Sequence, residues 1–181
     1  MSDTSLLFPI EPYKVNGYTF GERVRSRIIL WARHLGDDVV AKAGTRVVAI
    51  GDGEVVWSEM RPGSATSHNW GGLVLIKHRD VRDGKDYYSL YGHIKDVTLK
   101  VGDMVTRGQL VGLVADGNSP ENGWWKLPHL HFGIYAGPWM NRVLPGYKRF
   151  FDDRTKFSWW RNPKNFITQY NKAVENRLAT K

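Results

Sequence analysis

Two histidines in the stretch LPHLHFGIY, residues 127–135, are spaced so that both side chains can serve one site. The stretch is typical of a β-strand, in which His129 and His131 share one face while Leu130 and Phe132 point to the other. Imidazoles bind metals and exchange protons near neutral pH. A lone His-x-His pair is more often two partly exposed histidines on a solvated sheet face, so a functional site here requires partners elsewhere.

The turn RHLGDD, residues 33–38, supplies such partners in His34 and Asp38. The chain contains no cysteine, which excludes disulfides and thiolate ligands and leaves imidazoles and carboxylates for any metal. Because catalytic zinc uses three protein ligands and a water, His34, Asp38 and one histidine of the pair suffice. Strand geometry does not choose between His129 and His131. Taken alone, the turn is also typical of a surface loop whose carboxylate caps a neighbouring amide.

A further histidine ends the run YYSLYGH, residues 87–93. Strand alternation predicts that Tyr91 and His93 share one face, with His93 at the strand end where active-site groups often lie. Trp124 and Trp125 precede the histidine pair, so their loop either overhangs a groove and presents an apolar wall to substrate or anchors the segment in the core. Tyr91, Trp124 and Trp125 are the candidate substrate-groove residues, although two adjacent tryptophans would face opposite ways.

The elements that position these residues form an antiparallel, mainly β fold. Short apolar or alternating runs between Thr45 and Tyr135 are split by glycine-rich turns. A Gly-Asp-Gly turn at 51–53 predicts a hairpin between strands 45–50 and 54–58, and a polar turn at 83–86 predicts another between 73–78 and 87–93. Further strands are expected at 97–101, 109–115 and 129–135, and an apolar run covers 28–32. A helix is expected after Asn162 and Pro163, with an apolar stripe at Phe166, Tyr170, Val174 and Leu178.

Composition narrows the class of protein and its partners. A length of 181 residues fits one domain with a substantial core. The net charge of +8 favours an anionic partner such as an acidic wall polymer, whereas scattered basic residues without a nucleic-acid-binding motif argue against nucleic acid. No stretch approaches the roughly 20 apolar residues of a membrane span, so we expect no integral membrane protein, and no signal peptide is visible.

With these motifs in order, the sequence resembles the M23 family of zinc endopeptidases, the LytM and lysostaphin type that cuts peptide cross-bridges of peptidoglycan. The resemblance rests on HLGDD at 34–38, YGH at 91–93 and PHLHF at 128–132, with support from FGER at 20–23 and IKH at 76–78. It covers roughly residues 8–136. It implies that His34, Asp38 and His131 bind Zn²⁺ while His93 and His129 assist catalysis.

The resemblance also implies a lysostaphin-like core, the duplicated hybrid motif, in which an antiparallel sheet carries a groove and a C-terminal α-helix is added. We expect an N-terminal segment at 1–20, an M23-like core at 21–136, and an extension at 137–181 within the same globular unit. The implied function is zinc-dependent hydrolysis of peptidoglycan cross-links in the periplasm, or as a secreted protein at the cell wall. The alternative is a non-catalytic relative that binds wall peptides or activates another hydrolase.

Three positions depart from the family pattern. Gly71-Gly72 stands where relatives often have Gly-Asn, and Gly133 follows the His-Leu-His-Phe motif in place of a frequent Glu. Residues 118–127 form a longer segment than the usual short turn. None of these changes removes an expected ligand, so they bear on the choice of substrate.

Overall fold

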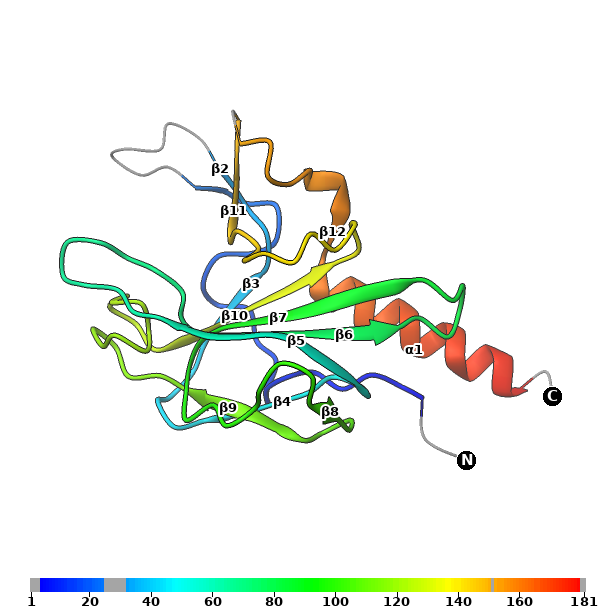
Figure 1. Ribbon diagram of the computed structural model, residues 1–181. Helices are drawn as coiled ribbons and strands as arrows, with labels where there is room; N and C mark the ends of the chain where they lie inside the picture. Colours follow the sequence, from blue (N-terminus) through cyan, green and yellow to red (C-terminus); the bar gives the residue numbers. More distant parts are fainter. Residues whose placement is uncertain (1–3, 25–31, 151, 180–181) are drawn as a thin grey trace.

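The computed structural model describes residues 4–24, 32–150 and 152–179 of the chain (Figure 1). The larger of two antiparallel sheets has nine strands in the order β12-β10-β7-β6-β5-β8, with β3 paired to β10 and β9 joining β7 to β4. Its strands are β3 (Asp37–Val40), β4 (Arg46–Val48), β5 (Gly53–Arg61), β6 (Gly71–Arg79), β7 (Asp86–Lys95), β8 (Met104–Val105), β9 (Leu110–Val114), β10 (His129–Tyr135) and β12 (Trp160–Arg161).

A smaller sheet stands beside the first and has the order β1-β2-β11. It consists of β1 (Arg23–Val24), β2 (Ala32–His34) and β11 (Tyr147–Arg149). Strand β2 leads directly into β3 of the larger sheet (Figure 1). The two sheets therefore meet where the His34 to Asp38 turn crosses between them.

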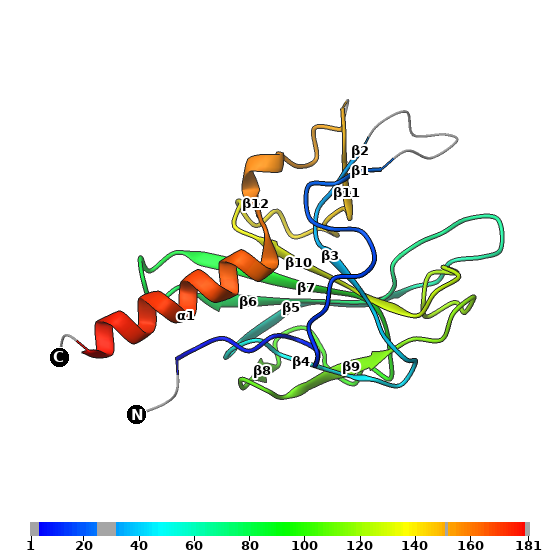
Figure 2. The ribbon, with the colours of Figure 1, turned by 180° about the vertical axis from the view of Figure 1, so that it is seen from behind.

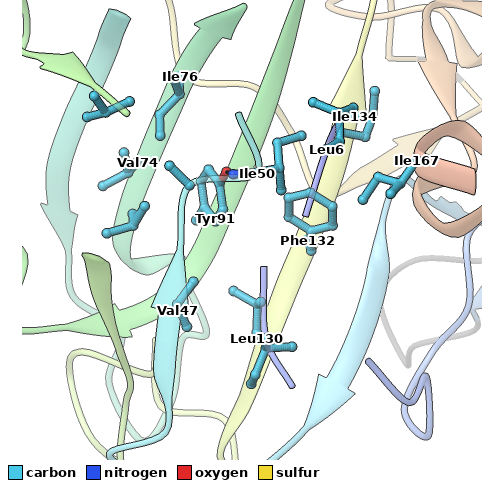
Figure 3. Close-up of a cluster of buried hydrophobic side chains, with 14 of the residues drawn as sticks. Leu6, Val47, Ile50, Val74, Ile76, Tyr91, Leu130, Phe132, Ile134 and Ile167 are labelled. Carbon is cyan, nitrogen blue, oxygen red and sulfur yellow. Dashed lines mark hydrogen bonds between the residues drawn. The ribbon is translucent and has the colours of Figure 1, made fainter. Parts of the chain in front are cut away.

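The central strands of the larger sheet are buried on both faces. On β6, Val74 and Ile76 belong to one apolar cluster while Leu73 and Leu75 belong to the other. The first cluster also takes in Leu130, Phe132 and Ile134 of β10 (Figure 3). Such two-sided burial explains why β6 reads as a continuous apolar run.

The C-terminal helix covers part of the first cluster. Helix α1 (Pro163–Ala179) lies along the sheet and buries Phe166, Ile167, Tyr170 and Val174 (Figure 2). Asn162 caps it, since the side-chain Oδ1 accepts a hydrogen bond from Asn165 N at 2.9 Å. Leu178 is 63% exposed, so the predicted apolar stripe ends at Val174. Within the described ranges, the helices fall short of the length and hydropathy of a membrane-spanning segment.

Several predicted elements are confirmed. Strand β10 spans residues 129–135 as expected, and β6 and β7 form a hairpin in which Arg79 pairs with Asp86 across the polar turn. The predicted helix starts at Pro163. Of the predicted apolar run at 28–32, residues 28–31 lie outside the described part of the chain.

Two predictions about local pairing are wrong. Gly51-Asp52-Gly53 does not close a hairpin, because β4 pairs with β9 while β5 pairs with β6 and β8. The turn is a crossover instead, in which Asp52 accepts a hydrogen bond from Arg107 N at 2.7 Å. Residues 97–101 form no strand; Val97 and Leu99 pack against the core without a ladder. Apolar alternation predicts which residues are buried but does not identify their pairing partners.

Candidate metal centre and active site

Three buried side chains from β2, β3 and β10 converge on one point. His34 Nε2 lies 3.0 Å from His131 Nδ1 and 3.2 Å from Asp38 Oδ1, and His131 Nδ1 lies 2.9 Å from the same carboxylate oxygen. One donor atom from each residue falls within 4.8 Å of the other two. The cluster can therefore offer three ligands to a single ion.

The chemistry of this donor set fits zinc. Two imidazoles and one carboxylate are a common catalytic zinc set, and ligands about 2.0–2.2 Å from a tetrahedral ion lie roughly 3.3–3.6 Å apart. The observed separations of 2.9–3.2 Å are only slightly shorter. A small outward shift of the three side chains would accommodate the ion.

Sheet register and a glycine bring these three donor residues together. Asp38 and His131 are direct partners across the β3–β10 pair. The chain between His34 and Asp38 passes so close to β10 that a Cβ on Gly36 would lie 2.5 Å from the Phe132 carbonyl oxygen and 2.6 Å from His131 Nε2. Gly36 is therefore required by close approach of the backbone.

Hydrogen bonding prepares His34 for ligation. His34 Nδ1 lies 3.3 Å from the Thr19 carbonyl oxygen, which can only accept, so the proton belongs on Nδ1 and the lone pair on Nε2 faces the other two donors. Metal binding requires this unprotonated nitrogen.

Burial and hydrogen bonding also set the charges of the other two residues. Burial alone would raise the pKa of Asp38, but its hydrogen bonds with His131 and His34 outweigh that effect and bring the pKa well below its ordinary value. Burial lowers the pKa of His131 to about 4, against the opposing influence of Asp38. At neutral pH the cluster thus contains a carboxylate and a neutral imidazole, the forms that bind metal.

His129 and His93 lie next to this cluster without entering it. Their rings are 4.4 Å apart, and the His93 ring is 6.3 Å from that of His131. His129 Nδ1 donates to the Leu127 carbonyl oxygen at 2.8 Å, which leaves its Nε2 as the unprotonated nitrogen. Burial, followed by repulsion from His129 and His131, lowers the pKa of His93 well below its ordinary value. Both rings are positioned to exchange protons beside the donor cluster.

A backbone irregularity, not strand alternation, brings His93 to the site. The register places Gly92 opposite His131, so regular alternation would put His93 on the far face together with Tyr91. His93 instead has a φ of 64°, in the left-handed region that is uncommon for non-glycine residues. His93 N is held by the Trp70 carbonyl oxygen at 3.0 Å, and such strain is frequent at functional sites.

The expectation that Tyr91 lines the groove is wrong. Its side chain is fully buried in the core, where it packs 5.4 Å from Phe132 between ring centroids (Figure 3). Its hydroxyl accepts a hydrogen bond from Ile50 N at 3.1 Å and is 3.0 Å from Ser89 Oγ. The irregularity at His93 is what separates the two residues onto different faces.

Of the two tryptophans, Trp125 is the one at the site. It stacks on His68 with 4.1 Å between centroids and meets the rings of His93 and His129 edge-on at 6.3 and 6.4 Å. Two hollows flank the donor cluster, and both are lined by Trp125 and Tyr147. Trp124 lines neither and has a φ of 68°.

Sequence reasoning missed three aromatic residues of the site. Tyr147 packs 5.2 Å from the His34 ring, Trp70 lies 4.9 Å from the His131 ring, and Tyr18 borders one hollow. Tyr18 precedes the FGER motif and Trp70 precedes the Gly71-Gly72 departure, and these positions in the sequence could have pointed to them. Tyr147 lies beyond the resembling segment, where the aromatic and basic character of residues 142–151 was the only signal that could have pointed to it.

Two of the three departures from the family pattern are structurally connected. A Cβ on Gly71 would lie 1.7 Å from the Glu121 carbonyl oxygen, so the long 118–127 segment packs directly on the glycine backbone. Gly72 N donates to the same oxygen at 3.0 Å, and Asn69 N donates to Gly123 O at 3.1 Å. Buried Asn122 donates to the carbonyl oxygens of Trp125 and Leu127. The extra segment is therefore fixed in place and presents Trp125 to the site.

The two remaining histidines are apart from the donor cluster. His78 is buried and lies 2.8 Å from the Asp52 carbonyl oxygen and 2.7 Å from Ser89 Oγ. It therefore serves the core, as a hydrogen-bonded structural residue would. His68 is exposed and stacks on Trp125.

Comparison with known proteins agrees with this geometry. The family model described as Peptidase family M23 matches residues 32–142. The peptidoglycan DD-endopeptidase ShyA of Vibrio cholerae is 36% identical over 103 residues, which are 57% of this chain and 20% of ShyA. The glycyl-glycine endopeptidase ALE-1 of Staphylococcus capitis is 33% identical over 113 residues, or 61% of this chain and 26% of ALE-1. The chain thus spans about a fifth to a quarter of these relatives.

Solved structures agree on the fold. A zinc-containing peptidase from Vibrio cholerae superposes with a TM-score of 0.55 at 25% identity, covering 70% of this chain and 35% of that one. The catalytic domain of lysostaphin from Staphylococcus simulans gives 0.52 at 24% identity, covering 84% and 90%. The fold is therefore that of lysostaphin-like domains. With the matched segment spanning most of the chain, from β2 through β10 and including all five site residues, the chain belongs to peptidase family M23.

Proposed function

We propose that this protein is a zinc-dependent endopeptidase that hydrolyses peptide cross-links of bacterial peptidoglycan. The observation that carries the proposal is the buried convergence of His34 Nε2, Asp38 Oδ1 and His131 Nδ1 within 4.8 Å. Three such donors next to two further histidines are the arrangement that metal-assisted amide hydrolysis needs.

His34, Asp38 and His131 would hold the zinc. Bound zinc supplies Lewis acidity, which polarises a carbonyl and lowers the pKa of a water to about 7. The buried Asp38 carboxylate contributes negative charge to the cluster. The Thr19 carbonyl keeps the His34 ring in its ligating tautomer.

His129 and His93 would carry the protons. His129 has its Nδ1–H engaged by the Leu127 carbonyl, so Nε2 is free to accept a proton from the attacking water and return it to the leaving amine. His93, 4.4 Å away between ring centroids, is placed to donate a hydrogen bond to the oxygen on which charge develops. Burial keeps His93 neutral, so its proton is available as a donor without an added buried charge.

The two hollows beside the donor cluster would bind the peptide on either side of the scissile bond. Trp125 and Tyr147 line both, so they border the path of the chain through the site. Peptidoglycan is proposed as the substrate because the names of relatives such as ShyA state that they are peptidoglycan endopeptidases. Activity on this polymer would place the protein in the periplasm or, once secreted, at the cell wall. The net charge of +8 favours an acidic wall polymer as a further partner. Nucleic acid is not proposed as a partner.

The test is mass spectrometry of the products released from purified cross-linked peptidoglycan by zinc-loaded protein. Cleaved cross-bridge peptides should appear with the intact protein and should be absent with the His131→Ala variant. Zinc-bound protein that releases no product from walls of several cross-link types would contradict the proposal. Retained binding to those walls would then indicate the non-catalytic, wall-binding alternative.

A further inference from the structure

A second surface feature lies on the small sheet, away from the donor cluster. Of the described residues that line a hollow of about 470 Å³ there, four are basic, none is acidic and the others are apolar. Its basic residues are Arg23, Arg33, Lys148 and Arg149, and its other residues are Ala32, Phe150 and Phe157. The hollow therefore has the electrostatic character of an anion-binding site.

Sheet register concentrates this charge. Arg33 is the direct cross-strand partner of both Arg23 on β1 and Lys148 on β11, so three cations form one row across the sheet. Like charges directly opposite one another destabilise a sheet. Neutral residues at these positions would form the same strands without that cost, so the row points to a role in binding.

Within the described ranges, no carboxylate forms an ion pair with the arginines of this hollow. Among the described residues, Arg23, Arg33 and Arg149 take part in no ion pair. The carboxylate of Asp152, whose carbonyl oxygen accepts from Lys148 Nζ, is itself occupied by Arg154. The guanidinium groups are therefore available for bidentate contacts with an external anion.

The aromatic residues of the hollow favour an acidic peptide over nucleic acid. Phe157 stacks on Phe20 with 5.1 Å between centroids, and the Arg33 guanidinium lies 5.1 Å from the same ring. With both neighbours present, Phe157 supports Arg33 and offers no platform for stacking a base. Phe150 is 83% exposed, so among the described residues the hollow has one exposed aromatic side chain, whereas single-stranded nucleic acid is usually bound on several.

The position of the hollow connects it to the substrate path. Arg33 immediately precedes His34 on β2, and Lys148 and Arg149 immediately follow Tyr147, which lines both hollows of the active site. Strand alternation puts Arg33 and Lys148 on the face opposite to His34 and Tyr147, so a polymer lying in the groove would reach the hollow by passing around the edge of the small sheet, which stands beside the larger one (Figure 1).

We infer that the basic hollow is an exosite that binds carboxylates of the acidic stem peptides of polymeric peptidoglycan. The inference rests on the proposed function, and it adds a prediction that the active site alone does not make. Cleavage of polymer should depend on the hollow, whereas cleavage of a short soluble cross-linked fragment, which cannot reach both sites, should not.

The test compares a double variant, Arg23→Gln with Arg149→Gln, and a matched control, Arg46→Gln with Lys100→Gln. Both variants remove two exposed positive charges, and the control positions lie near β4 and β8, away from the small sheet. The double variant should cleave insoluble peptidoglycan, stripped of attached polymers, about tenfold more slowly, as expected from two partly exposed charge contacts. The double variant should cleave the short soluble cross-linked fragment at the wild-type rate. The control variant should match wild type on both the insoluble and the soluble substrate.

Binding separates failure of the inference from failure of the proposed function. Pull-down of the His129→Ala protein by the stripped peptidoglycan should weaken in the double variant and when the wall carboxylates are amidated. Equal losses in the control, unchanged binding to amidated walls, or tighter binding to single-stranded DNA or a polyol-phosphate polymer would overturn the exosite. Absence of cleavage by wild-type protein on both substrates would refute the proposed function, while the pull-down would still decide the exosite.

Discussion

Acid should destabilise this protein through His78, in a pH window that follows from its burial. Burial lowers the pKa of His78 from 6.5 to about 4, with the hydrogen bond to the Asp52 carbonyl opposing the change. Between pH 6.5 and 4 the unfolded chain therefore binds a proton that the folded chain excludes. The stability due to neutral His78 is complete above pH 6.5 and is lost as the pH falls towards 4.

The size of the effect follows from the difference between the two pKa values. A difference of about 2.5 corresponds to roughly 3 kcal/mol once both states are protonated, and to a little over 1 kcal/mol at pH 5.5. The Ser89 and Tyr91 hydroxyls that continue the network from His78 carry no charge in this range, so they do not add to it.

The assay is urea unfolding of wild type and the His78→Gln variant at pH 7.5, 6.5, 5.5 and 4.5, in a chelator so that metal binding does not contribute. The free energy of unfolding of wild type should fall relative to the variant by a little over 1 kcal/mol between pH 7.5 and 5.5. His68→Gln, at an exposed position, serves as the control and should show no such difference. A wild-type minus His78→Gln difference that stays flat with pH would refute the reasoning.

Three further predictions, made with four substitutions, test how the site and fold are built. Gly36→Ala places a methyl group 2.5 Å from the Phe132 carbonyl oxygen and 2.6 Å from His131 Nε2, so zinc affinity should fall by about tenfold or more in competition with a chelating dye; unchanged affinity would contradict the close approach. Trp125→Ala should lower kcat/KM on a cross-linked fragment about tenfold while the zinc content stays intact, because Trp125 lines both hollows. Trp124→Ala should lower kcat/KM less. Equal losses in the two variants would remove the distinction between them. Asn162→Ala should lower the free energy of unfolding by about 1 kcal/mol in thermal denaturation without changing activity, and no change in stability would show that the cap is unimportant.

Sequence patterns predicted the parts of the site that depend on local geometry. The shared face of His129 and His131 follows from strand alternation and is confirmed. Leu130 and Phe132, which alternate with the two histidines along β10, point to the other face and are buried in the core. Long-range pairing was not predictable in the same way. The Gly51-Asp52-Gly53 turn has hairpin composition, yet β5 pairs with β6 and β8 and not with β4.

The position of His93 shows a different limit. Periodicity assigned it to the face of Tyr91, and only a left-handed backbone angle, stabilised by contacts with residues 70 and 115, turns it towards His129. Similarly, Gly71 gave no hint that the long 118–127 segment would pack against it. In both cases the decisive contact joins segments far apart in the sequence, so no local pattern reports it.

The central claim is the division of five residues into three zinc ligands and two proton carriers. Its most direct test is metal analysis and turnover for single alanine variants of all five, after identical zinc loading and dialysis. Wild type, His93→Ala and His129→Ala should each keep about one zinc per chain, with turnover lost in the two variants, while the variants at His34, Asp38 and His131 should lose the metal. Loss of zinc in His129→Ala, or retention of zinc and activity in His131→Ala, would contradict the account.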